Sequence, residues 1–172
     1  MPTPDSHDAV PAEHCVYLGL GSNLGDRRAH LLWAIEALRP FVTIEKVSSV
    51  YDTAPLLVTD QPRFLNIACA GRTRLEPLTL LRALKAIERE AGRTEGPRYG
   101  PRPLDIDILL YDDLTLSLPE LVIPHPSMQD RAFVLEPLAE IAPNVLHPTL
   151  GVPISELLNG VDRTGVARLG LL

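Results

Sequence analysis

Two aspartates in the segment PLDIDILLY, residues 103–111, have the spacing that points most directly to chemistry. Side chains alternate between the two faces of a β-strand, so Asp105 and Asp107 would share one face. Their backbones would lie about 7 Å apart, which lets both carboxylates reach one cation. Two unpaired carboxylates are costly on a half-buried face, and ligands that are all oxygen favour Mg²⁺. The pair therefore indicates a magnesium site, unless it lies on the solvated outer face of an edge strand.

Three arginines come shortly before these aspartates, in RTEGPRYGPR, residues 93–102. The segment has one acid, Glu95, and so a local surplus of two positive charges in an otherwise acidic chain. A guanidinium group matches phosphate oxygens in a bidentate way. Phosphate-binding cations beside carboxylates that bind Mg²⁺ are the groups that phosphoryl transfer needs, because its catalysis is mostly positioning and charge neutralisation. Taken without the aspartates, the same arginines are equally consistent with a solvated surface. They are Arg93, Arg98 and Arg102.

A glycine-rich segment, GLGSNLGD at residues 19–26, also suggests phosphate binding at first sight. Its glycines are spaced G-x-G-x-x-x-G, which differs from the G-x-G-x-x-G of dinucleotide-binding proteins, and the lysine of a P-loop is missing. A simple turn between a strand and a helix explains the segment equally well.

The length and composition indicate one globular domain, and its charge excludes some classes of binding partner. The chain has 172 residues, a net charge of -6 and a pI near 5.3, which argues against a general nucleic-acid binder. No apolar run approaches the length of a membrane span, and residues 1–14 do not resemble a secretory signal. Cys15 and Cys69 lie in apolar segments, which favours buried thiols over disulfides or a metal site. We expect a cytoplasmic protein with a disordered tail at 1–13 and a single domain at 14–172.

The hydrophobic pattern predicts the order β, α, β, β, α, β. The helices are bounded by identifiable signals, with Asp26 as an N-cap before the first and Pro77 in the first turn of the second. This order is that of an α+β, ferredoxin-like fold, an antiparallel sheet with helices on one face. Strands are expected at 15–20, 42–51, 64–70 and 104–111, helices between 26 and 40 and within 76–93, long loops at 52–63 and 92–103, and a C-terminal helical extension with helices near 131–141 and 154–158.

Four segments, in order from about Tyr17 to Pro143, resemble the 6-hydroxymethyl-7,8-dihydropterin pyrophosphokinase family. They are GLGSNLGDR, YDTAPLLVTDQPRFLNIA, GPRPLDIDILLYDD and VIPHPSMQDRAFVLEPLAEIAP. The most specific part is G-P-R-x-L-D-x-D-[IL]. The resemblance implies a ferredoxin-like fold and transfer of pyrophosphate from ATP to the hydroxymethyl group of the pterin. The products would be AMP and the pterin diphosphate, in a step of folate biosynthesis. The family has no P-loop, so the glycine-rich segment becomes a turn near the pterin.

The resemblance also assigns roles to individual residues. Asp105 and Asp107 would bind two Mg²⁺ ions that bridge the ATP phosphates, and Asp107 is also a candidate acceptor of the hydroxyl proton. Arg93 and Arg102 would act in catalysis on the phosphates. The residues expected to contact ATP are Glu88, Arg93, Arg98, Arg102, Ile108, His125 and Arg131. The residues expected at the pterin are Thr53, Ala54, Pro55, Leu56, Phe64, Asn66, Tyr99 and Phe133. A flat ring suits aromatic faces and an amide that both donates and accepts.

Some positions depart from the family pattern. Tyr99 stands where tryptophan is usual, Phe64 where tyrosine is frequent, and Glu95 where a basic residue often binds phosphate. Lys85 and Pro126 also replace residues that commonly contact the nucleotide. The expected partners are ATP and a pterin, with no nucleic acid and no membrane, and a monomer is favoured over an oligomer.

Three other interpretations stay open. A Mg²⁺-dependent nucleotidyltransferase also carries a Gly-Ser turn and a D-x-D pair, but there the two lie close in sequence, whereas Ser22 and Asp105 are more than eighty residues apart. An RNA-binding ferredoxin-like module would need aromatic residues on its central strands and a basic face. A non-catalytic relative that serves as an interaction module would be expected to lose the aspartate pair.

Overall fold

The computed structural model describes residues 10–92, 96 and 99–172. Most of the predicted tail, and the predicted site residues Arg93 and Arg98, lie outside the described residues. The strands are β1 (His14–Ser22), β2 (Thr43–Val47), β3 (Val50–Thr53), β4 (Phe64–Thr73), β5 (Asp105–Tyr111), β6 (Leu116–Ser117), β7 (Val122–Ile123) and β8 (Val166–Gly170). The helices are α1 (Arg27–Leu38), α2 (Pro77–Glu90), the short 3₁₀ helix Met128–Asp130, α3 (Ala132–Ile141) and α4 (Ile154–Asn159).

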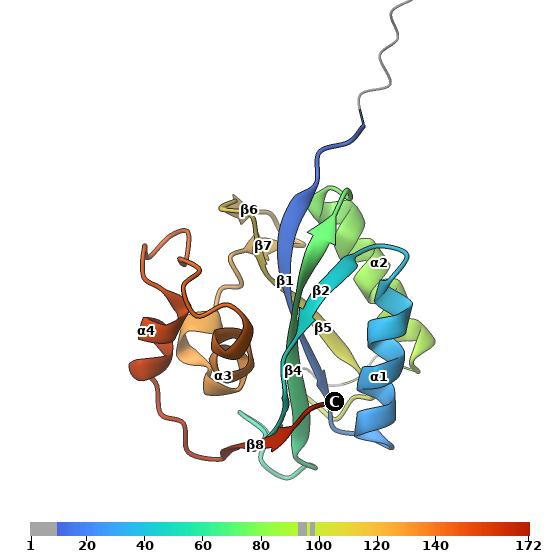
Figure 1. Ribbon diagram of the computed structural model, residues 1–172. Coiled ribbons are helices and arrows are strands. Elements are labelled where there is room, and N and C mark those ends of the chain that lie inside the picture. Colours follow the sequence, from blue (N-terminus) through green and yellow to red (C-terminus); the bar gives the residue numbers. More distant parts are fainter. Residues whose placement is uncertain (1–9, 93–95, 97–98) are drawn as a thin grey trace, which may run out of the picture.

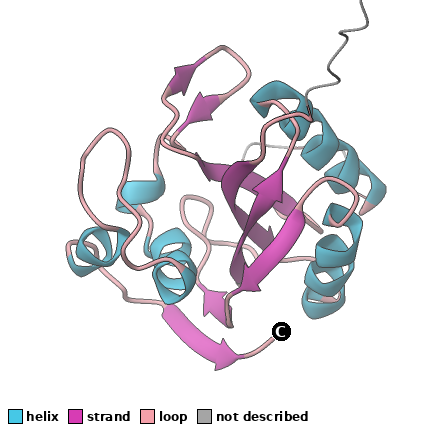
Figure 2. Cartoon of the chain, turned by 45° about the horizontal axis from the view of Figure 1, so that its top comes forward, coloured by secondary structure: helices cyan, strands magenta, loops and turns pink. Residues whose placement is uncertain are grey.

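The main sheet is antiparallel, with the strand order β5-β1-β4-β3-β8, and β2 also pairs with β4. Helices α1 and α2 cover one face of the sheet, and α3, with α4 beside it, covers the other (Figure 1, Figure 2). The two helices predicted on one face are α1 and α2, and helices α3 and α4 of the C-terminal extension lie on the other face. The mixed α/β architecture with an antiparallel sheet is as expected.

The strand predicted at 42–51 is interrupted at Ser48 and Ser49, which separate β2 from β3. The hydroxyl of Ser48 accepts a hydrogen bond from the backbone N–H of Ala68 at 2.9 Å. The backbone N–H of Ser48 donates to the carbonyl of Ala68, also at 2.9 Å. The serine side chain thus replaces a backbone partner in the ladder, so that β2 and β3 pair with different halves of β4.

The predicted helical extension was incomplete, because the chain ends in a strand. Val166–Gly170 forms β8, which pairs antiparallel with β3 at the edge of the sheet. Its sequence, VARLG, leaves three central residues exposed, so hydrophobic alternation gave no signal. A small hairpin of β6 and β7 was also missed, since each strand has only two residues.

The sheet separates two hydrophobic clusters. The first includes the buried stripes of α1 and α2, such as Leu31 and Leu84, together with Ile106 and Ile108 of β5. The second joins α3 and α4 to Leu109 and neighbouring residues on the other face. Because Ile106 and Ile108 are buried in the first cluster, Asp105 and Asp107 lie on the opposite face of β5, where only the later residues, such as Leu109, are buried.

The predicted helix signals act as expected. Asp26 caps α1 by accepting the backbone N–H of Ala29 at 3.0 Å, and Pro77 opens α2. Gly92, just after α2, has φ 95°, a conformation that glycine adopts without strain. No helix in the described ranges is long and apolar enough to cross a membrane.

Candidate active site

A cavity of about 810 Å³ lies where the ends of β1, β4 and β5 meet the segments 54–63 and 99–103. This volume is within the range of small-molecule sites. The predicted site residues on its wall are Ala54, Leu56, Phe64, Asn66, Tyr99, Arg102, Asp105, Asp107, His125, Arg131 and Phe133. Residues separated by up to 79 positions in the sequence are therefore brought to one place.

The two aspartates lie side by side on the open face of β5. Their partners on the neighbouring strand β1 are Gly21, opposite Asp105, and Gly19, opposite Asp107. Because the cross-strand neighbours have no side chains, space is left beside both carboxylates. Burial in the cavity, and then the negative charge of Asp105, raise the pKa of Asp107 to about 7. A divalent cation would relieve both the desolvation and the repulsion.

Among the described residues, few other metal ligands lie near this pair. Within the part of the chain that the structure describes, no group of three or more His, Cys, Asp or Glu residues is placed to hold a metal ion. Mg²⁺ is commonly bound by one or two carboxylates, with water and substrate phosphates completing its coordination. The Asp105–Asp107 pair fits that donor set better than it fits a metal site made of protein ligands alone.

Arg102 lies against the same pair. Its Nε atom is 3.9 Å from a carboxylate oxygen of Asp105, and its guanidinium carbon is 5.7 Å from the centre of the Phe64 ring. Within the described residues, the buried Nε has no hydrogen-bond partner. A buried N–H donor without an acceptor is energetically unfavourable, and an anionic ligand could accept its hydrogen bond.

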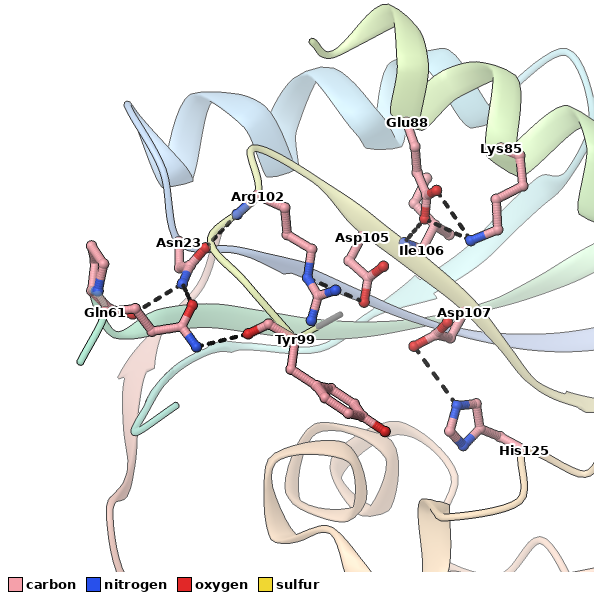
Figure 3. A network of polar contacts seen from close by, with 11 residues as sticks. Asn23, Gln61, Lys85, Glu88, Tyr99, Arg102, Asp105, Ile106, Asp107 and His125 are labelled. Atoms are coloured by element: carbon pink, nitrogen blue, oxygen red, sulfur yellow. Dashed lines mark hydrogen bonds and ion pairs between the residues drawn. The ribbon is translucent and has the colours of Figure 1, made fainter. Parts of the chain in front are cut away.

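His125 approaches the aspartates from the segment after β7. Its Nε2 lies 3.9 Å from an oxygen of Asp107 (Figure 3). Its Nδ1 accepts the backbone N–H of Ser127 at 3.3 Å. Burial, and then the charge of Arg131, lower the pKa of His125 to about 4. The ring is therefore neutral at pH 7, and Nδ1 as an acceptor leaves the proton on Nε2, where it can be donated into the cavity. Arg131 itself lies 5.8 Å from the centre of the Phe133 ring.

Two residues predicted to contact ATP do not line the cavity. Glu88 is 2% exposed, accepts the backbone N–H of Ile106 at 2.7 Å and pairs with Lys85 at 3.1 Å (Figure 3). Ile108 is buried in the core against the helices, because it lies on the opposite face of β5 from the aspartates. Its backbone alone is available, since β5 is an edge strand of the main sheet.

The cavity wall near Asn66 suits a flat heterocycle. Asn66 donates from Nδ2 to the Thr53 hydroxyl at 2.7 Å, which orients its amide. A Cβ atom at Gly21 would lie 2.6 Å from Oδ1 of Asn66, so only glycine leaves the amide in place. Thr53 is buried behind Asn66, and neither Thr53 nor Pro55 is on the cavity wall.

Sequence reasoning missed several residues on the wall. Lys85 lines the cavity, although it was considered only as a departure from a family pattern. Gln61 also lines it and links two loops, but it lies in a loop without any periodicity that could have signalled a role. Others that were missed are Leu24, Leu57, Gly96, Gly100, Pro101, Pro103 and Ser127.

Comparison with known proteins agrees with this geometry. The family model described as 7,8-dihydro-6-hydroxymethylpterin-pyrophosphokinase (HPPK) matches residues 17–143. The chain belongs to the HPPK family. This range includes the whole aspartate pair, the arginine segment and the described wall of the cavity.

Bacterial relatives are named as pyrophosphokinases of the same kind, and a plant relative as a folate synthesis protein. The chain is 47% identical over 141 residues to the 2-amino-4-hydroxy-6-hydroxymethyldihydropteridine pyrophosphokinase of Aquifex aeolicus, covering 82% of this chain and 88% of that protein. It is 47% identical over 156 residues to the protein of the same name from Pseudomonas aeruginosa, covering 90% and 96%. A mitochondrial folate synthesis bifunctional protein of Arabidopsis thaliana is 48% identical over 130 residues, which are 75% of this chain and 24% of that protein.

Solved structures of HPPK-DHPS share the fold. A Plasmodium falciparum HPPK-DHPS crystallised with pterin and p-hydrobenzoate aligns with a TM-score of 0.70 at 18% identity, over 88% of this chain and 45% of that one. An HPPK-DHPS in complex with substrates aligns with a TM-score of 0.77 at 16% identity, over 93% and 47%. The chain thus spans about half the length of these HPPK-DHPS chains.

Proposed function

We propose that the protein transfers the pyrophosphate group of ATP to the hydroxymethyl group of 6-hydroxymethyl-7,8-dihydropterin. The products are AMP and the pterin diphosphate, and the reaction is a step of folate biosynthesis. Membership of the HPPK family and the names of full-length bacterial relatives support this activity. The observation that carries it is that one cavity is lined both by an aspartate pair with Arg102 and by the amide of Asn66.

Asp105 and Asp107 are the residues that would hold Mg²⁺, and we propose two ions. When bound, Mg²⁺ neutralises phosphate charge and supports the attacking and leaving oxygens of the displacement. The raised pKa of Asp107 and the scarcity of other ligands fit a metal that arrives with the nucleotide. Asp107 would also accept the proton of the pterin hydroxyl, because it lines the cavity and its side chain is 40% exposed.

The cationic residues would bind the phosphates. Arg102 offers its unused Nε, Arg131 lines the cavity, and neutral His125 can donate from Nε2. Arg93 and Arg98 are proposed for the same task from the sequence. Glu88 would act on ATP only indirectly, through Lys85 and the backbone of β5. Ile108 could contribute only its backbone.

The pterin would lie against Asn66, with aromatic side chains bounding the ring. Phe64, Tyr99 and Phe133 are on the cavity wall, and Asn66 offers an amide whose orientation is set by Thr53. Ala54 and Leu56 complete this end, while Thr53 and Pro55 support it from outside the wall. An amide and aromatic faces together distinguish a heterocycle from a purely apolar ligand.

We also propose that residues 14–172 form one domain with a ferredoxin-like sheet. When β2 and β3 are counted as one interrupted strand, the elements β1 to β5 follow the order βαββαβ. The first and third strands of this unit are then β1 and β4, and they lie in the middle of the sheet. This arrangement supports the ferredoxin-like assignment. A monomeric state and a cytoplasmic location stay predictions from the sequence.

Product analysis tests the proposed reaction. The protein is mixed with ATP, Mg²⁺ and 6-hydroxymethyl-7,8-dihydropterin, beside a sample without pterin, an Asp107→Ala variant and an Asp113→Ala variant. Asp113 is an exposed acid outside the cavity and serves as the matched control. AMP should form only with pterin, in the wild type and in Asp113→Ala. Release of pyrophosphate would indicate a nucleotidyltransferase instead, ADP an ordinary kinase, and no turnover by folded protein a binding module.

A further inference from the structure

A single carbonyl group near the C-terminus contacts both ends of the loop 54–63. The oxygen of Gly165 accepts a hydrogen bond from the backbone N–H of Ala54 at 3.0 Å and another from Nη2 of Arg63 at 2.9 Å. Ala54 begins the loop and Arg63 ends it, while Gly165 directly precedes β8. A carbonyl oxygen has two lone pairs, so the loop uses both of its acceptor sites. The separation of the two loop ends therefore depends on where Gly165 lies.

The position of Gly165 is fixed from both sides. Val166, the first residue of β8, pairs with Thr53, the last residue of β3, at the edge of the sheet (Figure 1). Before Gly165, the carboxylate of Asp162 accepts the backbone N–H of Thr164 at 2.9 Å, which forms an Asx-type turn. The turn and the strand together hold the Gly165 carbonyl against the loop.

Gly165 leaves no room for a side chain. Its φ is 79°, in the left-handed region that favours glycine. A Cβ atom at this position would also lie 3.1 Å from the Cβ of Ala54, which is closer than an ordinary contact. Because Ala54 lines the cavity, a side chain at position 165 would press against a residue of the cavity wall.

Arg63 contacts more than Gly165. Its guanidinium forms an ion pair with Asp52 of β3, and its carbonyl accepts a hydrogen bond from the guanidinium of Arg27 at 2.8 Å. The side chains of Arg63 and Asp52 are 45% and 23% exposed, so their ion pair adds little to the stability of the fold. Its effect is on geometry, because the planar guanidinium contacts the Asp52 carboxylate and the Gly165 carbonyl at once.

These contacts join a part of the chain inside the family model to a part outside it. The model matches residues 17–143, whereas Gly165 and β8 follow that range. The loop 54–63 lies within the range and contributes Ala54 and Leu56 to the cavity wall. The C-terminal segment thus contacts the cavity wall, although Gly165 itself is not on it.

We propose that Gly165 and Arg63 are positioning residues, through which the C-terminal segment fixes the part of the cavity wall assigned to the pterin. The inference rests on the proposed function, because that function places Ala54 and Leu56 at the pterin. Neither positioning residue contacts the substrate. They hold the two ends of the loop at one separation, so their loss weakens binding of the pterin more than binding of ATP.

Steady-state kinetics of two glycine variants test the proposal. Gly165→Ala is compared with Gly151→Ala, because Gly151 also has a left-handed φ, 67°, but its new methyl group would meet nothing within 4 Å. Both variants carry the same kind of backbone strain, so both should lower Tm by a similar amount. Gly165→Ala alone should raise KM for the pterin, by about three- to tenfold, and leave kcat and KM for ATP within about twofold of the wild type.

A second pair of variants removes a contact without adding bulk to the turn. Arg63→Met should raise KM for the pterin by a similar factor. Arg72→Met is the control, because it breaks an exposed ion pair with Glu45 and Arg72 does not line the cavity. Equal KM values for the pterin within either pair of variants would overturn the proposal. A rise in KM for ATP as large as the rise for the pterin would also overturn it.

Hydrogen exchange separates this proposal from the proposed function. The backbone N–H of Ala54, which donates to Gly165, should exchange faster in Gly165→Ala than in Gly151→Ala. Equal exchange rates would contradict the positioning role, whatever the activity of the protein. If the wild type formed no AMP from ATP and the pterin, the proposed function would fail, while faster exchange at Ala54 would still support the role of Gly165 in holding the loop.

Discussion

Glu88 of α2 accepts a hydrogen bond at 2.7 Å from the backbone N–H of Ile106, the residue that separates the two aspartates of β5. The Glu88 side chain is 2% exposed, and its other partner, Lys85, is 39% exposed and lines the cavity. Helix α2 therefore fixes the strand that carries the aspartate pair, through a carboxylate buried behind it. This relationship gives Glu88 a task in positioning Asp105 and Asp107.

Substitution Glu88→Ala should lower the free energy of unfolding by about 1–3 kcal/mol, because the Ile106 N–H is left buried without an acceptor. It should also weaken Mg²⁺-dependent turnover. Glu90→Ala, an exposed acid on the same helix, is the control and should change the stability little. Urea unfolding of the three proteins measures the effect. Equal stability of the two variants would contradict the assigned role.

Substitution Gly21→Ala should raise KM for the pterin by about 10- to 100-fold and change KM for ATP much less. The new methyl group would lie 2.6 Å from Oδ1 of Asn66 and displace the amide from Thr53. Gly160→Ala, just after α4 and outside the cavity, would place its methyl group 3.5 Å from the Leu157 carbonyl oxygen, an ordinary contact, and serves as the control. Steady-state kinetics with each substrate varied in turn measure the difference. Similar rises in both KM values would point to a general disturbance of β1.

Removal of Mg²⁺ with EDTA should abolish AMP formation, and added Mg²⁺ should restore it. Asp105→Asn and Asp107→Asn should each reduce the rate by about 100-fold or more, because the metal contributes several kcal/mol of charge stabilisation. Isothermal titration with ATP should show tighter binding with Mg²⁺ than without it in the wild type alone. The same Mg²⁺ dependence in both variants would reject the aspartates as metal ligands.

Glu140 of α3 links this helix to strand β3 and to Ser49, the residue before it. It accepts hydrogen bonds from the N–H of Ser49 at 3.0 Å, from the Ser49 hydroxyl at 2.8 Å and from the Tyr51 hydroxyl at 2.6 Å. Burial alone would raise the pKa of Glu140, but the hydrogen bonds from Tyr51 and Ser49 outweigh it, and the pKa is lowered. The ionised form is therefore favoured by folding.

Because its folded pKa lies below the unfolded value, Glu140 stabilises the fold at neutral pH and loses this effect as the pH falls through the folded pKa. Glu140→Gln should therefore lower the free energy of unfolding by about 1–3 kcal/mol at pH 7. The difference from the wild type should shrink below about pH 4. Glu156→Gln, an exposed acid of α4, is the control. Denaturant unfolding at a series of pH values measures both, and a difference that did not vary with pH would count against the ionised network.

Much of the architecture was predictable, because sequence signals are strong where a helix has an apolar stripe along one side and capping residues at its ends. Asp26, Pro77 and Gly92 bound their helices as expected. The break at Ser48–Ser49 was not predictable, since it depends on a hydroxyl that bonds to a strand twenty residues away. Strand β8 was missed for a similar reason, because an exposed edge strand is stabilised by pairing and carries no apolar alternation.

The sequence alone determined that the two aspartates lie side by side, because residues at i and i+2 share a face in any strand. It also determined the family, through motifs whose order survives without coordinates. Only the tertiary structure decided which residues meet. It turned Glu88 toward β5 and buried Ile108 in the core, and it placed the amide of Asn23 between Gln61 and Arg102. Contacts between distant segments depend on the order of the strands in the sheet and on which buried polar groups still need a hydrogen-bond partner. A local sequence pattern contains neither kind of information.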